Sequence, residues 1–153
     1  MAKRFKFPLQ SVLDMRKRTE DERQQVVAER KRALELSEAE LQRLNDEFRA
    51  SSDRLRSAHR EFSGEELRLN YAHLQFLDRA ITAQIRVVAE RRVSLDRARA
   101  DLLEATKERK VVEKLRERRH QAFVAEELRI EQNELDDGNA RRFGQASHVG
   151  GIS

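Results

Sequence analysis

The sequence predicts an all-α protein, a long two-helix antiparallel coiled-coil hairpin with a disordered C-terminal tail. The 153-residue chain is 39% charged and 5% aromatic, with one proline and five glycines; this composition is typical of long helices or coiled coils. Its apolar residues recur in two runs at alternating steps of three and four, which is the period of a coiled-coil seam. One strong break separates the two runs, so the helices are expected to fold back on each other.

The first helix is predicted from about residue 8 to residue 62. Pro8 suits the first turn of a helix, and the apolar seam is regular from Leu34 onward. Nearer the N-terminus the same register meets charged residues, so the seam is weaker there. The regular seam comprises Leu34, Ser37, Leu41, Leu44, Phe48, Ser51, Leu55, Ala58 and Phe62.

The turn is predicted at residues 63–64. Ser63 and Glu66 have the spacing of a capping box, in which each side chain satisfies a free backbone amide of the other residue. Gly64 offers the backbone freedom that a chain reversal needs. Ser37 and Glu40 have the same spacing, but they lie inside an unbroken seam and do not indicate a helix start.

The second helix is predicted from about residue 65 to residue 137. Gly138 and Asn139 are typical of a helix end, and the small, polar, glycine-rich residues that follow predict a disordered tail over 141–153. The hairpin domain therefore spans residues 1–140. A single long rod that dimerises is the alternative. The second seam comprises Leu74, Leu77, Ile81, Gln84, Val88, Arg91, Leu95, Ala98, Leu102, Ala105, Arg109 and Val112.

The sequence contains no motif that supports catalysis. Its five glycines form no phosphate-binding loop, it has no cysteine, and no two histidines lie three or four residues apart as a metal site on a helix would require. No apolar run approaches the roughly 20 residues of a membrane helix, and no signal peptide is recognisable. We therefore expect a cytoplasmic protein that is not an enzyme and that binds no cofactor or metal.

Charge is unevenly distributed along the chain. Residues 107–119 carry seven bases and three glutamates, which favours a solvated face with i,i+4 ion pairs over a track for a phosphate backbone. Residues 1–18 have a net charge of +5 and residues 126–137 a net charge of −5. We expect these two segments to attract each other at the open end of the hairpin.

The chain resembles the flagellar FliJ export protein family. The resemblance covers nearly the whole chain up to about residue 140. It is carried by RFKFPLQSVLDMR near the N-terminus, LRLNYAHLQFLDRAITAQI over 67–85, RKVVEKLRERR over 109–119 and ELDD over 134–137.

This resemblance implies a non-enzymatic, chaperone-like component of the flagellar type III export apparatus. Such proteins form an antiparallel coiled coil similar to the central stalk of rotary ATPases. The implied partners are the hexameric export ATPase FliI, the cytoplasmic domain of the export gate protein FlhA, and export chaperones. The implied location is the cytoplasmic side of the inner membrane at the flagellar basal body.

Two sets of contact residues are expected. The gate set, carried over from the resemblance, comprises Leu44, Phe48, Tyr71, Leu74, Phe76, Leu77, Ala80 and Gln84. Tyr71 and Phe76 are its best candidates, because large exposed aromatic side chains mark binding surfaces. The ATPase-ring set lies at the open end of the hairpin and comprises Phe5, Phe7, Leu9 and Leu13, with both phenylalanines expected to be exposed.

Three alternatives to the flagellar function stay open. The chain could be the equivalent stalk of a virulence-type secretion system. It could be a nucleic-acid-binding coiled coil that uses Arg91, Arg92 and residues 107–119, although nucleic acid is not the favoured partner. It could also be a scaffolding coiled coil that forms homodimers through its seams.

Overall fold

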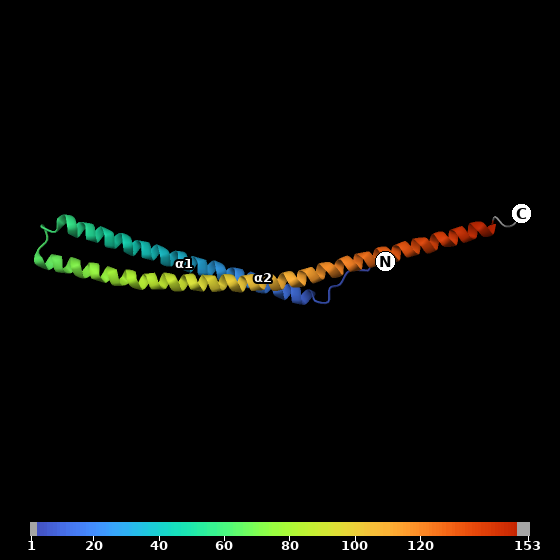
Figure 1. The fold of residues 1–153 in the computed structure, drawn as a ribbon, viewed down its shortest axis with the longest axis horizontal. Helices are drawn as coiled ribbons and strands as arrows, with labels where there is room; N and C mark the ends of the chain where they lie inside the picture. Colours follow the sequence, from blue (N-terminus) through green and yellow to red (C-terminus); the bar gives the residue numbers. More distant parts are fainter. Residues whose placement is uncertain (1–2, 150–153) are drawn as a thin grey trace. The chain divides into compact units, whose positions relative to one another are not determined.

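The protein is built from two long helices. The computed structural model describes the backbone of residues 3–149 and the side chains of residues 3–145. Helix α1 comprises Gln10–Ala58 and helix α2 comprises Gly64–Val149, and no strand occurs among the described residues (Figure 1). The predicted all-α, two-helix fold is confirmed.

Two compact units make up the chain. One comprises residues 18–106, in which the second part of α1 and the first part of α2 form an antiparallel hairpin. The other combines the N-terminal residues up to 17 with residues from 107 onward. Both helices contribute residues to both units.

The core of the 18–106 unit is a single stripe between the two helices. Leu77 is 1% exposed and Leu95 is 3% exposed, and both belong to the predicted second seam. Because two helices can bury only one stripe on each, small residues suffice at several core positions. The buried residues of this unit are Ser37, Leu44, Leu55, Leu77, Val88, Leu95, Ala98 and Ala105.

A buried serine in the seam is satisfied by local and cross-helix hydrogen bonds. The Ser37 hydroxyl donates to the Leu34 carbonyl at 2.8 Å, and the Gln84 side-chain amide donates to the Ser37 carbonyl at 2.9 Å. Polar groups that are buried without partners would destabilise the helix pair. The helix is continuous through Ser37 and Glu40, so the capping-box spacing at these residues does not begin a helix.

The turn follows the predicted capping box. The Ser63 hydroxyl accepts from the Glu66 amide at 3.2 Å, and the Glu66 carboxylate accepts from the Ser63 amide at 3.1 Å. The backbone freedom expected of Gly64 is not used, because no described glycine has a positive φ. Gly64 is instead the first residue of α2. Helix α1 ends at Ala58, four residues before the predicted end at Phe62.

Helix α2 continues past its predicted end. Gly138 and Asn139 lie inside the helix, and residues 141–149 of the predicted tail are helical. A glycine in an exposed helix costs only about 1 kcal/mol relative to alanine, and the surrounding leucine and arginine residues favour helix. Gly138 does not adopt the left-handed conformation of a helix cap. Residues 150–153 of the predicted tail lie outside the described residues.

A substitution at the centre of the core tests this packing. We expect Leu77→Ala to lower the free energy of unfolding by about 3 kcal/mol, because it opens a cavity at the most buried position of the seam. Urea unfolding followed by circular dichroism measures the change. The matched control is Leu69→Ala, at a position that is 68% exposed, and it should change stability by no more than about 0.5 kcal/mol. Equal losses in the two variants would contradict the assigned register.

Candidate functional site

The N-terminal residues pack against α2 within their own unit. Phe7 is 8% exposed and Leu13 is 2% exposed, and Phe5 and Leu9 are half-buried. The expectation that Phe5 and Phe7 are exposed is therefore wrong. Residues 3–7 form no helix, and their burial alternates, so that the phenylalanines lie against α2 while Arg4 and Lys6 are exposed.

Aromatic and cationic side chains hold this segment in place. The Phe5 ring meets the His120 ring edge-on with centroids 5.0 Å apart, and it lies 5.6 Å from the Phe123 ring. The Arg116 guanidinium lies 5.8 Å from the Phe5 centroid, and the Arg119 guanidinium lies 6.0 Å from the Phe7 centroid. Aromatic pairs and cation–π contacts of this kind each stabilise by about 0.5–1.5 kcal/mol.

Polar contacts continue along the first turns of α1. Arg16 donates to Glu108 at 2.7 Å, and Arg116 donates to the Gln10 side chain at 3.0 Å. These contacts place residues 5–16 beside residues 108–123. The acidic segment 126–137, which charge alone had favoured, does not supply these partners. Exposed charge pairs contribute little to stability. We therefore attribute the alignment of the N-terminal segment along α2 mainly to the ring contacts of Phe5.

The middle of the hairpin presents two different flanks. Tyr71 and Phe76 are 50% and 59% exposed, and five residues of an α-helix separate them by about 140° around its axis. They therefore project on opposite sides of the buried stripe that contains Leu77. The expected gate residues do not form one surface.

The first flank, which we call the Phe76 flank, is an apolar stripe along α2. Its members recur at steps of seven, four, three and four, so they lie on one face of the helix. Ala83 and Val87 were not among the expected contact residues, although the same spacing in the sequence could have identified them. The Phe76 flank comprises Leu69, Phe76, Ala80, Ala83 and Val87.

Charged residues of α1 border the Phe76 flank. His73 lies 3.4 Å from the Glu47 carboxylate, which places Glu47 beside this stripe. Arg43 bridges Glu40 and Glu47 at 2.7 and 3.1 Å. Its hydrogen bonds lower the pKa of the Glu40 carboxyl, so Glu40 stays ionised at neutral pH. The stripe is therefore apolar with a charged border, which is the usual composition of a protein interface.

The second flank, which we call the Tyr71 flank, is a shallow groove across both helices. One hollow of about 410 Å³ includes Tyr71, and a neighbouring hollow of about 470 Å³ includes Phe48. Leu55 is buried at the base of the hollow that includes Tyr71. The residues around the groove are mostly polar. The Tyr71 flank comprises Phe48, Ser52, Arg56 and His59 of α1 and Tyr71 and Leu74 of α2.

Three expected gate residues are engaged inside the hairpin. Leu44 is 7% exposed and Leu77 is 1% exposed, so both contribute to the core. Gln84 is half-buried, and its amide bonds the Ser37 carbonyl. Leu44 and Leu77 thus belong to the core, and Gln84 takes part in a contact between the two helices.

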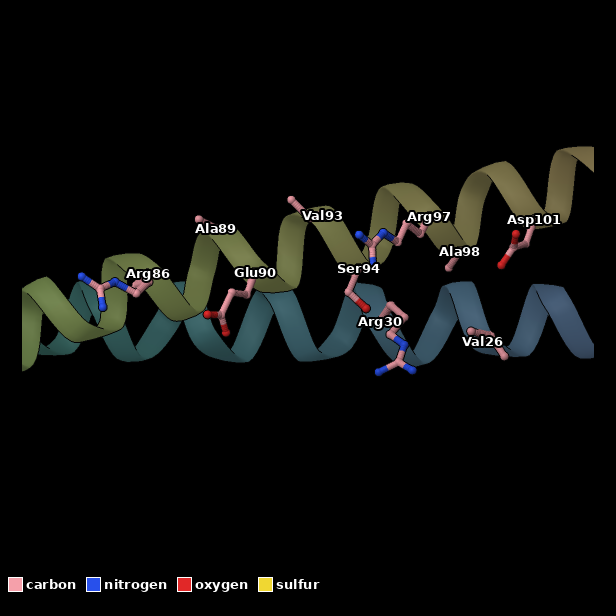
Figure 2. A pocket seen from close by; sticks show the side chains of 10 residues that line it. All are labelled: Val26, Arg30, Arg86, Ala89, Glu90, Val93, Ser94, Arg97, Ala98 and Asp101. Carbon is pink, nitrogen blue, oxygen red and sulfur yellow. The ribbon is translucent and has the colours of Figure 1, made fainter.

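A larger groove lies between residues 26–30 of α1 and 86–101 of α2. It has a volume of about 640 Å³ and contains side chains of both charges, including Arg30, Glu90 and Asp101 (Figure 2). Eight of its ten lining residues come from α2 and two from α1, so most of its wall is formed by α2. Two of its lining residues, Ser94 and Ala98, have small side chains.

Within residues 3–145, no cluster of three or more His, Cys, Asp or Glu side chains is placed to hold a metal ion. Neither helix, over its described length, has a stretch that is long and apolar enough to cross a membrane. The basic residues named for nucleic-acid binding are partly neutralised, since Arg92 pairs with Glu38 at 3.3 Å and Arg109 with Glu113 at 2.6 Å.

Comparison with known proteins adds a family and a fold. The model of a family described as flagellar FliJ protein matches residues 5–148. Among solved structures, the chain is similar to CT670 from Chlamydia trachomatis, a proposed homologue of YscO, with 21% identity and a TM-score of 0.62. This match covers 95% of the present chain and 99% of CT670, and it shows a shared fold. No curated protein matches the sequence.

The N-terminal packing can be tested by hydrogen exchange. We expect Phe7→Ala to accelerate amide exchange in α2 around His120 by about tenfold, because an uncovered single helix opens locally more often. Mass spectrometry of the exchanged protein measures this effect. Lys6→Ala is the control, since Lys6 is exposed beside Phe7 and its removal should leave exchange unchanged. Unchanged exchange in Phe7→Ala would show that the segment does not protect α2.

Proposed function

The chain belongs to the flagellar FliJ protein family, whose members are components of the type III export apparatus, and on this premise we propose that it is a non-enzymatic stalk and adaptor. In this proposal it links the ring of the export ATPase FliI to the cytoplasmic domain of the gate protein FlhA. It assists the export of flagellar proteins and meets export chaperones. It is located at the inner membrane of the flagellar basal body through these partners.

The observation that supports an adaptor role most directly is the Phe76 flank. Phe76 and Leu69 are 59% and 68% exposed on a chain with a mean hydropathy of −0.86. Large apolar side chains that are exposed in a row on a charged helix indicate a protein-binding surface. Among the described residues, no cluster of side chains that could hold a metal ion lies on either helix.

We assign gate binding to the Phe76 flank. Its five apolar residues extend over about five turns of α2, whereas the Tyr71 flank has a mostly polar rim. Small residues at Ala80 and Ala83 allow a partner element to approach closely between Phe76 and Val87. Leu44 and Leu77 keep a supporting role in the core beneath both flanks.

The proposed function is tested by binding the purified protein to its two principal partners. The export ATPase and the cytoplasmic domain of the gate protein from the same organism should each retain the full-length chain in a pull-down. DNA-cellulose is the control, and it should retain the chain only at low salt. If neither export component binds while salt-sensitive binding to DNA occurs, the proposed function is wrong.

A pair of matched variants tests the assignment of the flank. We expect Phe76→Asp to weaken binding to the gate domain by about thirtyfold, equivalent to about 2 kcal/mol, because it places a charge in the centre of an apolar contact. Isothermal titration calorimetry measures the affinity. Tyr71→Asp adds the same charge on the opposite flank and should change the affinity by no more than about twofold. The reverse order of effects would assign gate binding to the Tyr71 flank.

A further inference from the structure

The positive charge of the protein is concentrated in one unit. Residues 3–17 and 107–123 together hold twelve Lys and Arg side chains and four Asp and Glu side chains, a net charge of +8. The whole chain has a net charge of only +4, so the remaining residues are net acidic. The two basic segments nevertheless pack against each other. Like charges held close together in this way attract an acidic partner.

The bases of this unit fall into two groups. Four arginines are engaged by neighbouring side chains. Arg16 pairs with Glu108 and Arg109 pairs with Glu113. Arg116 and Arg119 are exposed, but their side chains contact Phe5, Phe7 and Gln10. The others are exposed and form no ion pair with any side chain of residues 3–145. These outer bases are Lys3, Arg4, Lys6, Lys17, Lys107, Lys110, Lys114 and Arg118.

The outer bases lie on both sides of the packed pair. Lys107, Lys110, Lys114 and Arg118 recur at steps of three, four and four, and form one stripe along α2. By the helical period this stripe points away from the face of α2 that meets Phe5 and Leu13. On the other side, Arg4 and Lys6 are exposed and alternate with half-buried Phe5 and buried Phe7.

This arrangement fits a partner that surrounds the helix. A flat lipid surface could reach the bases of one side only. Single-stranded nucleic acid would need exposed aromatic side chains for base stacking, and here Phe5 and Phe7 are packed against α2. Lysine dominates the stripe, and its flexible ammonium group attracts carboxylates without fixed geometry.

Building on the proposed function, we infer that the outer bases bind acidic side chains lining the opening of the ATPase ring. In this inference the α2 stripe, Lys107, Lys110, Lys114 and Arg118, supplies one side of the contact. Arg4 and Lys6 supply the other. Phe5, Phe7 and Leu13, which the sequence suggested as ring contacts, instead hold the two basic segments together.

A charge-neutralised variant tests this inference. The change is Lys107→Gln, Lys110→Gln, Lys114→Gln and Arg118→Gln, made together in the full-length chain. Glutamine favours helix, and lower self-repulsion should leave thermal unfolding by circular dichroism unaffected or shifted upward. We expect association with the hexameric export ATPase, measured by surface plasmon resonance, to slow by about tenfold at low salt. The dependence of the rate on salt should also become shallower.

Two further variants separate charge from other effects. The matched control, Arg49→Gln, Arg56→Gln, Arg60→Gln and Arg68→Gln, removes the same charge from exposed positions near the turn of the hairpin. It should alter the association rate by no more than about twofold. The conservative variant, Lys107→Arg, Lys110→Arg and Lys114→Arg, should associate like the wild type, because charge without specific geometry is retained.

The outcomes distinguish this inference from the function on which it depends. If the wild type binds the ATPase and the neutralised variant associates equally fast, the inference is overturned while the stalk function stands. The same conclusion follows if neutralisation abolishes binding to phosphatidylglycerol vesicles or to DNA but not to the ATPase. If the wild type does not bind the ATPase at any salt concentration, both the stalk function and the inference fail.

Discussion

The constraint on which the structure depends is that two packed helices bury only one stripe on each. In the 18–106 unit this stripe holds Leu77, Leu95 and other buried residues, with serine and alanine at several positions. Every side chain beside the stripe is therefore at least partly exposed. A partner can approach the hairpin from either flank without disturbing its core, and binding specificity must reside in the residues next to the seam.

Residues that are close in sequence consequently have different roles. Leu77 is in the core, and its neighbour Phe76 projects from one flank. Tyr71, five residues earlier, projects from the other. An alignment of motifs groups such residues together as one contact set, whereas rotation along the helix separates them. The structure therefore separates the expected gate residues into core positions and two flanks, and it places Ala83 and Val87 on the same face as Phe76.

Much of the fold could be predicted from local sequence patterns. The two seams and the capping box at Ser63 and Glu66 depend on contacts at fixed sequence spacings, so their period identifies them. The end of α2 could not be predicted in this way, because Gly138 stops a helix only when a left-handed cap forms there. The burial of Phe7 depends on Arg119, which is more than 100 residues distant in the sequence, and no periodicity reports such a pairing.

The N-terminal pattern of alternating bases and aromatics shows how burial assigns roles within one motif. Phe5 and Phe7 meet rings and guanidinium groups of α2, while Arg4 and Lys6 are exposed. Arg116 and Arg119 are exposed, yet cation–π attraction holds their guanidinium groups beside the rings of Phe5 and Phe7. An exposed lysine keeps its charge available. Positive charge thus stabilises the fold where it lies beside an aromatic ring and provides long-range attraction where it has no such neighbour.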